Sequence, residues 1–283
     1  MYMKSKQWEH ICQKRIANFD INNFKQDLPG YAFTNFNPVN NGMRYLKSLT
    51  YYIAMNLNNR AIAFLKNIKN REVGNPIDVI TDRIKVDMDY IQAYYEYVNI
   101  EGYLVDSVIE IGAGYGRTCH AILSNSNIQK YIIVDIPDVL EISKQYLYKV
   151  LSRQQFKKIQ FCDTLPIPMG DSYDLCININ GFSEMTIEDV GEYVEYANEY
   201  CQNFYVKGPS AYYADSSICV PSFPNNGMLQ NNIIDDIHDY NKISKCKKTF
   251  VECYKPKDMY PLYVDWAIPW SYFLDVIYER SKV

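Results

Sequence analysis

Three glycines at alternate positions separate a β-branched strand from a helix in residues 108–118, which read Val-Ile-Glu-Ile-Gly-Ala-Gly-Tyr-Gly-Arg-Thr. Because glycine lacks a Cβ atom and tolerates positive φ, a turn built on Gly112, Gly114 and Gly116 lets a ligand approach bare backbone. A strand, a glycine turn and a helix N-terminus in this order indicate an α/β fold with a ligand at the turn. No other part of the chain constrains the fold as strongly.

The spacing of these glycines excludes two common phosphate-binding motifs. A dinucleotide-binding fold needs G-x-G-x-x-G, but the sixth position counted from Gly112 is Arg117. A P-loop needs a lysine after its last glycine, and none follows here. What remains is an acid, Glu110, followed by x-G-x-G-x-G.

A second apolar strand also ends in an acid, Asp135, after the run Tyr131-Ile132-Ile133-Val134. It lies about one βαβ half-unit downstream, where the ribose of a cofactor is expected. A carboxylate at this position can accept hydrogen bonds from both ribose hydroxyls. Ile136-Pro137-Asp138 then end the strand and open a helix, with proline at an early helical position.

Strands and helices alternate from residue 105 onward. Strands are expected at 105–111, 131–135, 158–162, 173–179 and 203–207, and helices at 116–125, 138–152 and 186–200. This alternation predicts an α/β fold with a parallel sheet, helices on both faces and ligands bound beyond the carboxyl ends of the strands. Residues 248–254 and 263–268 are expected to supply the last two strands.

The first hundred residues are predicted to be helical, with helices at 43–57, 60–69 and 85–97. Residues 1–100 are therefore assigned to an N-terminal helical cap or substrate region, and residues 101–283 to the cofactor-binding domain. These helices either cover the site, pair two copies in a homodimer, or simply pack on the sheet.

Composition excludes several classes of protein. A net charge of −4, with basic residues clustered only at 245–248, argues against a nucleic-acid partner. No stretch reaches the roughly 18 apolar residues of a membrane span, and no signal peptide is visible, so a cytoplasmic protein is expected. Eight cysteines without a C-x-x-C pair and three dispersed histidines predict neither disulfides nor a metal site.

The acid-x-G-x-G-x-G run resembles the first motif of class I S-adenosylmethionine (SAM) dependent methyltransferases. The resemblance implies a Rossmann-like, seven-stranded, mostly parallel sheet whose last two strands form an antiparallel edge. It also implies SAM as cofactor and S-adenosylhomocysteine (SAH) as product. SAM has no phosphates, so open backbone at the turn suits its methionyl part, and Glu110 can order the turn or meet the ammonium group.

The resemblance places the cofactor contacts at the ends of successive strands. It implies that Asp163 accepts from the adenine amino group and that the Thr164 N–H meets a ring nitrogen, although Asp163 could simply begin a turn. Arg117 either neutralises the methionyl carboxylate, binds an anionic substrate or is a solvated side chain. The expected cofactor-binding set is Glu110, Gly112, Ala113, Gly114, Gly116, Arg117, Asp135, Ile136, Asp163, Thr164 and Asn180.

Two further segments narrow the resemblance. The chain resembles the sugar O-methyltransferases found with bacterial surface-polysaccharide genes in three segments. These are the glycine run, Val134-Asp135-Ile136-Pro137 and Asn180-Gly181-Phe182-Ser183-Glu184-Met185. The resemblance covers about residues 75–215. It implies methylation of a small-molecule acceptor, namely a sugar, a sugar nucleotide or a related capsule precursor.

Methyl transfer to an alcohol usually needs a base or a metal, and no metal-ligand pattern is evident, so a metal-independent route is expected. Glu184, after the fourth strand, and His238, after the long loop at 209–226, are the candidate catalytic bases. The alternatives are that Glu184 only precedes a helix capped by Thr186 and that His238 is a surface residue.

Three other functions stay open at this point. The chain could methylate an amine, a phosphate-type group or another small molecule. It could be a non-catalytic SAM-binding subunit of a partner enzyme. A nicotinamide oxidoreductase is the least favoured, because Arg117 breaks the glycine pattern.

Overall fold

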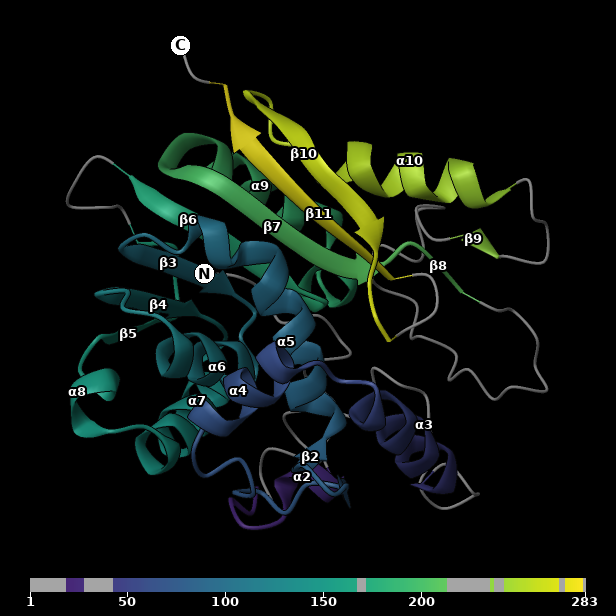
Figure 1. Ribbon diagram of the computed structural model, residues 1–283. Helices are drawn as coiled ribbons and strands as arrows, with labels where there is room; N and C mark the ends of the chain where they lie inside the picture. Colours follow the sequence, from purple (N-terminus) through teal and green to yellow (C-terminus); the bar gives the residue numbers. More distant parts are fainter. Residues whose placement is uncertain are drawn as a thin grey trace.

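A seven-stranded sheet forms the centre of the molecule in the computed structural model, which describes residues 19–27, 43–166, 172–212, 235–236, 242–269 and 273–281 (Figure 1). The strand order is β10-β11-β7-β6-β3-β4-β5. The bounds are β3 Ser107–Ile111, β4 Lys130–Val134, β5 Ile159–Cys162, β6 Tyr173–Ile179, β7 Cys201–Pro209, β10 Met259–Trp266 and β11 Phe273–Arg280.

The sheet is parallel from β7 to β5, and β11 runs antiparallel to both β7 and β10. The expected seven-stranded, mostly parallel α/β fold with an antiparallel edge is therefore confirmed. The chain builds outward from β3 through β4 to β5, and then crosses to β6 on the other side of β3. Such a switch point opens a crevice at the carboxyl ends of the strands, where ligands bind in folds of this kind.

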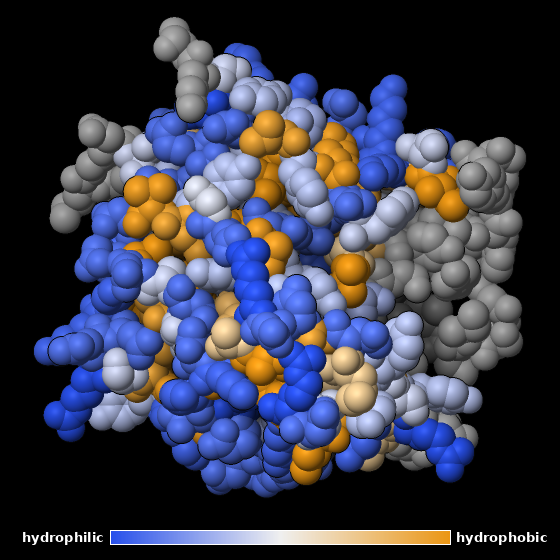
Figure 2. Space-filling model, viewed as in Figure 1, coloured by the Kyte–Doolittle hydropathy of each residue, from blue (hydrophilic) through white to orange (hydrophobic). Residues whose placement is uncertain are grey.

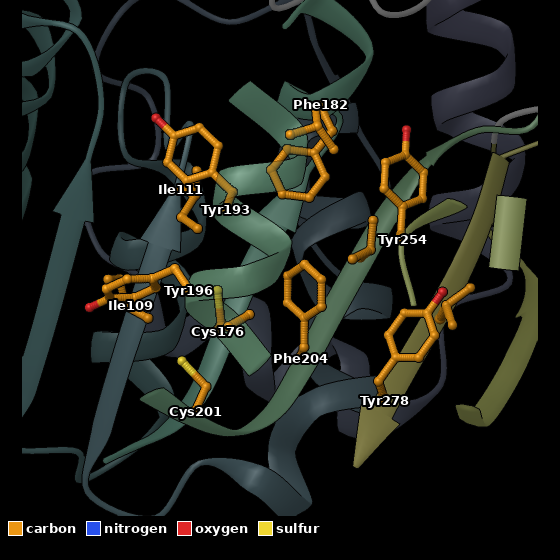
Figure 3. Close-up of a cluster of buried hydrophobic side chains, with 14 of the residues drawn as sticks. Ile109, Ile111, Cys176, Phe182, Tyr193, Tyr196, Cys201, Phe204, Tyr254 and Tyr278 are labelled. Carbon is orange, nitrogen blue, oxygen red and sulfur yellow. The ribbon is translucent and has the colours of Figure 1, made fainter. Parts of the chain in front are cut away.

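Helices cover both faces of the sheet. One face packs on α9 (Ile187–Tyr200) and α10 (Ile243–Cys253), and the other on α5 (Met88–Ile100), α6 (Arg117–Asn125) and α7 (Pro137–Val150). Adjacent residues of β3 show the alternation, since Ile109 belongs to the first core and Val108 to the second. Figure 3 shows the first core, in which Phe182 and Tyr254 stack with their ring centroids 5.5 Å apart. Because both faces are covered, β3 is apolar along most of its length and fully buried.

The N-terminal part packs on the sheet through α5. It contains α2 (Phe24–Asp27), α3 (Met43–Met55), α4 (Asn59–Asn67) and a hairpin of β1 (Asp78–Ile80) and β2 (Lys85–Asp87). A separate apolar core joins α3, α4, the hairpin and α5, and reaches α6 at Ala121. On the face shown in Figure 2, apolar residues lie in separate small groups among polar ones.

Most predicted elements are confirmed, including the helices expected at 43–57 and 60–69. The helix expected at 85–97 begins later, at Met88, because Lys85–Asp87 form a strand and Asp87 caps the helix by accepting from the Tyr90 N–H at 3.2 Å. The hairpin makes the prediction of an all-helical N-terminal region wrong.

The strand expected at 248–254 is also wrong, because this segment lies in α10. Cys246 and Phe250, four residues apart, are the buried positions of that helix, and Tyr254 caps its end against the Phe250 ring. The final strands are β10 and β11, and β11 was not expected. The short elements are η4 Glu101–Tyr103, α8 Arg153–Phe156, η5 Gly181–Glu184, β8 Ala211–Tyr212 and β9 Asp235–Asp236.

Within the described ranges, no helix combines the length and apolar character needed to cross a membrane.

Candidate functional site

The glycine turn follows β3 and has left-handed backbone at all three glycines, with φ of 72° at Gly112, 57° at Gly114 and 92° at Gly116. Gly116 caps α6, and a Cβ atom added there would lie 2.7 Å from Leu147 Cδ1. A Cβ atom added at Gly114 would meet nothing within 4 Å. Gly116 therefore serves close helix packing, whereas Gly114 borders open space that a ligand can enter.

Asp135 lies directly after β4 and faces this turn. Its Oδ2 accepts from the Gly114 N–H at 3.0 Å and its Oδ1 from the Ile136 N–H at 2.8 Å. Burial raises the pKa of Asp135 to about 7, although these two N–H groups favour the anion. Two fixed hydrogen bonds orient the carboxylate and leave further lone pairs for a ligand.

The Glu110 side chain leaves β3 on the face of the sheet that α6 covers. Its buried carboxyl group accepts from the Tyr131 hydroxyl at 2.6 Å and also bonds the Thr118 side chain. Burial raises its pKa to about 7. These contacts join β3 to β4 and to the first turn of α6, so Glu110 orders the elements on either side of the glycine turn. A contact with a cofactor ammonium stays a prediction.

Arg117 begins α6 and forms a nearly buried ion pair with Glu96 of α5. The two groups lie 2.8 Å apart, and Arg117 also donates to the Asp89 carbonyl at 2.9 Å. Lys207 of β7 lies 2.8 Å from the other oxygen of Glu96. Burial would raise the pKa of Glu96, but Arg117 and Lys207 outweigh it and lower that pKa. Arg117 is thus engaged within the protein, and the role expected for it toward a ligand carboxylate stays a prediction.

The end of β6 lies beside the glycine turn. The buried Asn178 donates to the Ile111 carbonyl at 2.8 Å and accepts from the Phe182 N–H at 3.2 Å, which fixes η5 against β3. Asn180 has left-handed backbone with φ of 64°, and its N–H donates to the Lys207 carbonyl. Asn178 was not among the expected site residues. A polar residue within the otherwise apolar run 175–179 was the signal that could have identified it.

The remaining predicted cofactor residues lie at neighbouring strand ends. Asp163 and Thr164 are exposed directly after β5, whose carboxyl end is joined to that of β4 by the Asp135 N–H and the Cys162 carbonyl at 3.2 Å. Ala113, which precedes Gly114, and Ile136, whose N–H donates to Asp135, are both partly exposed. The topology therefore brings the predicted residues of β3, β4 and β5 to one edge of the sheet.

Of the two predicted bases, the structure describes Glu184. It ends η5, is partly exposed and precedes Thr186, which caps α9 by accepting from the Asp189 N–H at 3.1 Å. His238 lies outside the described residues. In the described part of the chain, no three His, Cys, Asp or Glu side chains come together as a metal site would require.

Comparisons with known proteins show a structural likeness. No family model and no curated protein sequence matches the chain. The mitomycin 7-O-methyltransferase MmcR is 12% identical with a TM-score of 0.47, over 68% of this chain and 53% of that one. The methyltransferase domain of bacterial CtHen1 is 14% identical with a TM-score of 0.48, over 67% and 98%.

Human N-acetylserotonin methyltransferase, solved in complex with SAM, is 11% identical with a TM-score of 0.44, over 68% of this chain and 52% of that one. This chain therefore matches only about half the length of the mitomycin and human enzymes. At these identities and TM-scores, the likenesses carry neither a cofactor nor a reaction over to this chain.

Proposed function

We propose that the chain binds SAM at the carboxyl ends of β3, β4 and β5 and is a SAM-dependent methyltransferase. The observation that supports this most is the Asp135 carboxylate, held by the N–H groups of Gly114 and Ile136 beside the open backbone of Gly114. An oriented carboxylate next to a bare turn suits the ribose hydroxyls of a nucleoside.

The surrounding residues fit a nucleoside without phosphates. Arg117, the basic residue at the start of α6, is paired with Glu96, so it is not a free counter-charge for a pyrophosphate. The exposed Asp163 and Thr164 would meet the adenine. The remaining members of the proposed cofactor set are Glu110, Gly112, Ala113, Gly116, Arg117, Ile136 and Asn180.

SAM, when bound, would supply a methyl group already activated on its sulfonium. The chain would then need to hold the acceptor in line with that group, exclude water and take up a proton. We assign proton removal to Glu184, at the β6 end, or to His238. The N-terminal region of residues 1–100 would cover the acceptor, or pair two copies in a homodimer.

The acceptor class rests on the sequence segment 180–185. We propose a hydroxyl of a sugar, a sugar nucleotide or a related surface-polysaccharide precursor made in the cytoplasm. Asn180 and Ser183 are nearly buried at the end of β6, where Ser183 Oγ donates to the Asn180 carbonyl at 2.7 Å. This hydrogen bond fixes the segment that would present Glu184 to the acceptor.

The test is a methyl-transfer assay with methyl-labelled SAM against sugar nucleotides, free sugars, amines and phosphate-type acceptors. Label in a sugar hydroxyl, slowed in E184Q with unchanged SAH affinity, is the expected result. Label only in an amine would contradict the acceptor class. SAH binding without turnover, with a stable hetero-complex on co-purification, would identify a non-catalytic subunit instead.

A further inference from the structure

Lys25 is a buried lysine in residues 19–27, a segment that we call the strap. The side chain is 3% exposed, and its ammonium lies 4.9 Å from the ring centroid of Tyr146, 5.0 Å from that of Tyr90 and 5.3 Å from that of Tyr115. It donates to the Tyr146 hydroxyl and to the Arg71 carbonyl, both at 3.1 Å. An ammonium removed from water needs such compensation, so these contacts specify a charged side chain here.

Tyr115 is the residue through which the strap reaches the glycine turn, because it stands between Gly114 and Gly116. The Phe24 ring packs edge-on against Tyr115 with the centroids 5.1 Å apart. The Tyr115 hydroxyl donates to Asp89 Oδ2 of α5 at 2.8 Å. The turn is therefore held by the strap and by α5, two segments far from it in sequence.

The strap has a defined seat on the domain. The Lys25 N–H donates to the Gly74 carbonyl at 2.9 Å, and Gly74 has a left-handed φ of 92°. A Cβ atom at Gly74 would lie 2.5 Å from Phe24 Cε1. Only glycine lets Phe24 and Lys25 dock this closely, so the arrangement is built into the backbone.

A chain of hydroxyl groups extends the contact of Lys25 into the core. Tyr146 and Tyr90 share a hydrogen bond of 2.6 Å, and Tyr90 lies 2.6 Å from His120 Nδ1. Because the Lys25 ammonium can only donate, the Tyr146 O–H donates to the Tyr90 oxygen, and the Tyr90 O–H donates to Nδ1 of a neutral His120, whose pKa is lowered by burial. The charge of Lys25 thus sets the direction of three consecutive hydrogen bonds.

We propose that Lys25 is a positioning residue for the cofactor turn. Docking of the strap holds Tyr115, and through it the backbone of Gly114, in the conformation that receives the nucleoside. Gly114 has no side chain and no neighbour where a Cβ atom would stand, so adjacent groups must fix its conformation. This inference rests on the proposed function, and by linkage it makes strap docking and cofactor binding strengthen each other equally.

The first test uses the unmodified protein. Trypsin can cleave after Lys25 only when the strap leaves its seat, because the ammonium is buried. We expect saturating SAH to slow cleavage after Lys25 at least about fivefold, as measured by mass spectrometry of the fragments. Equal cleavage rates with and without SAH, while calorimetry shows SAH bound, would overturn the inference.

The second test compares variants of one strap. K25M should weaken SAH binding about tenfold, K25R should restore part of the loss, and N22A should leave it unchanged. Asn22 is the matched control, because its contacts are with the exposed Lys149 ammonium and with Asp20, both outside the tyrosine cluster. A purely structural Lys25 would lower the melting temperature of K25M without moving SAH affinity, which contradicts the proposal. If the wild-type protein binds no SAH at all, the proposed function itself is wrong. If it binds SAH but the variants do not change its affinity, only the role of the strap is wrong.

Discussion

Asp135 accepts a 3.0 Å hydrogen bond from the backbone N–H of Gly114, which joins the end of β4 to the glycine turn after β3. The two residues are 21 positions apart, and each was predicted separately from its own sequence motif. Their contact places an oriented carboxylate beside open backbone at the switch point of the sheet. It is the geometry on which the proposed SAM site depends.

Replacing Asp135 should weaken cofactor binding without unfolding the protein. We expect D135A to lower SAH affinity by about 10- to 100-fold, because hydrogen bonds to a charged group are lost. The matched control is D174N at the opposite end of the sheet, where Asp174 accepts from the Ser107 N–H at 2.7 Å. D174N should lower the melting temperature and leave SAH affinity unchanged. Equal affinities of D135A and the wild-type protein, measured by calorimetry, would remove Asp135 from the site.

SAH affinity should also depend on pH. Burial raises the pKa of Asp135 to about 7, so the carboxylate that accepts the ribose hydroxyls is lost as the pH falls below 7. We expect affinity to rise from pH 6 to pH 8 in the wild-type protein and to stay flat in D135N. E110Q separates the two carboxyl groups, because burial also raises the pKa of Glu110 to about 7. If Asp135 carries the titration, the affinity of E110Q still rises from pH 6 to pH 8, whatever its absolute value. If SAH affinity in E110Q did not change with pH, the titrating group would be Glu110 and not Asp135, which would contradict the prediction.

The raised pKa of Asp135 should also make the stability of the ligand-free protein depend on pH. The folded-state pKa of Asp135 is raised above its ordinary value of 3.8, so its contribution to stability is fully present below that value and is lost as the pH rises through about 7. D135N should therefore gain stability relative to the wild-type protein between pH 5 and pH 8. Urea unfolding across this range measures the difference, and a constant difference would contradict the shift.

Gly114 and Gly116 should respond differently to alanine. G116A places a Cβ atom 2.7 Å from Leu147 at a φ of 92°, and should cost about 2 kcal/mol or more of stability. G114A meets no protein atom within 4 Å and should cost about 1 kcal/mol for its left-handed backbone. The added methyl group lies in the proposed site, so G114A should weaken SAH binding although it destabilises the fold only slightly. The prediction is wrong if SAH affinity in G114A equals that of the wild-type protein.

Breaking the buried charge cluster around Glu96 should strongly destabilise the protein. E96Q leaves Arg117 and Lys207 facing a neutral group, and should cost about 3–5 kcal/mol in urea unfolding. The comparison is R60A, which removes an exposed ion pair with Glu101 and should change stability little. Similar small losses in both variants would mean that the Glu96 cluster relaxes or admits water.

The sequence predicted elements with strong local signals. The strand–glycine turn–helix unit and the strand ending at Asp135 lie where expected, because propensity, burial and turn residues agree there. The strand predicted at 248–254 was wrong because a short apolar run fits a buried strand as well as a helix. The four-residue spacing of Cys246 and Phe250 indicates a helix, but only the structure shows that both residues are buried.

Contacts distant in sequence were beyond local patterns. Lys207 meets Glu96 across 111 positions, and Lys25 meets Tyr146 across 121. Neither pair has a periodicity or a turn signature that could reveal it. A ligand-binding role for Arg117 was predicted from its position at the start of a helix. Only the three-dimensional structure shows that Arg117 forms an ion pair with Glu96.

The most direct test of the account is calorimetric titration of SAH into the folded wild-type protein and into D135A. The account predicts saturable binding at one site in the wild-type protein and a strongly weakened isotherm in D135A, with both proteins folded by circular dichroism. No binding of SAH or SAM to the folded wild-type protein would contradict the proposed cofactor and, with it, the methyltransferase function.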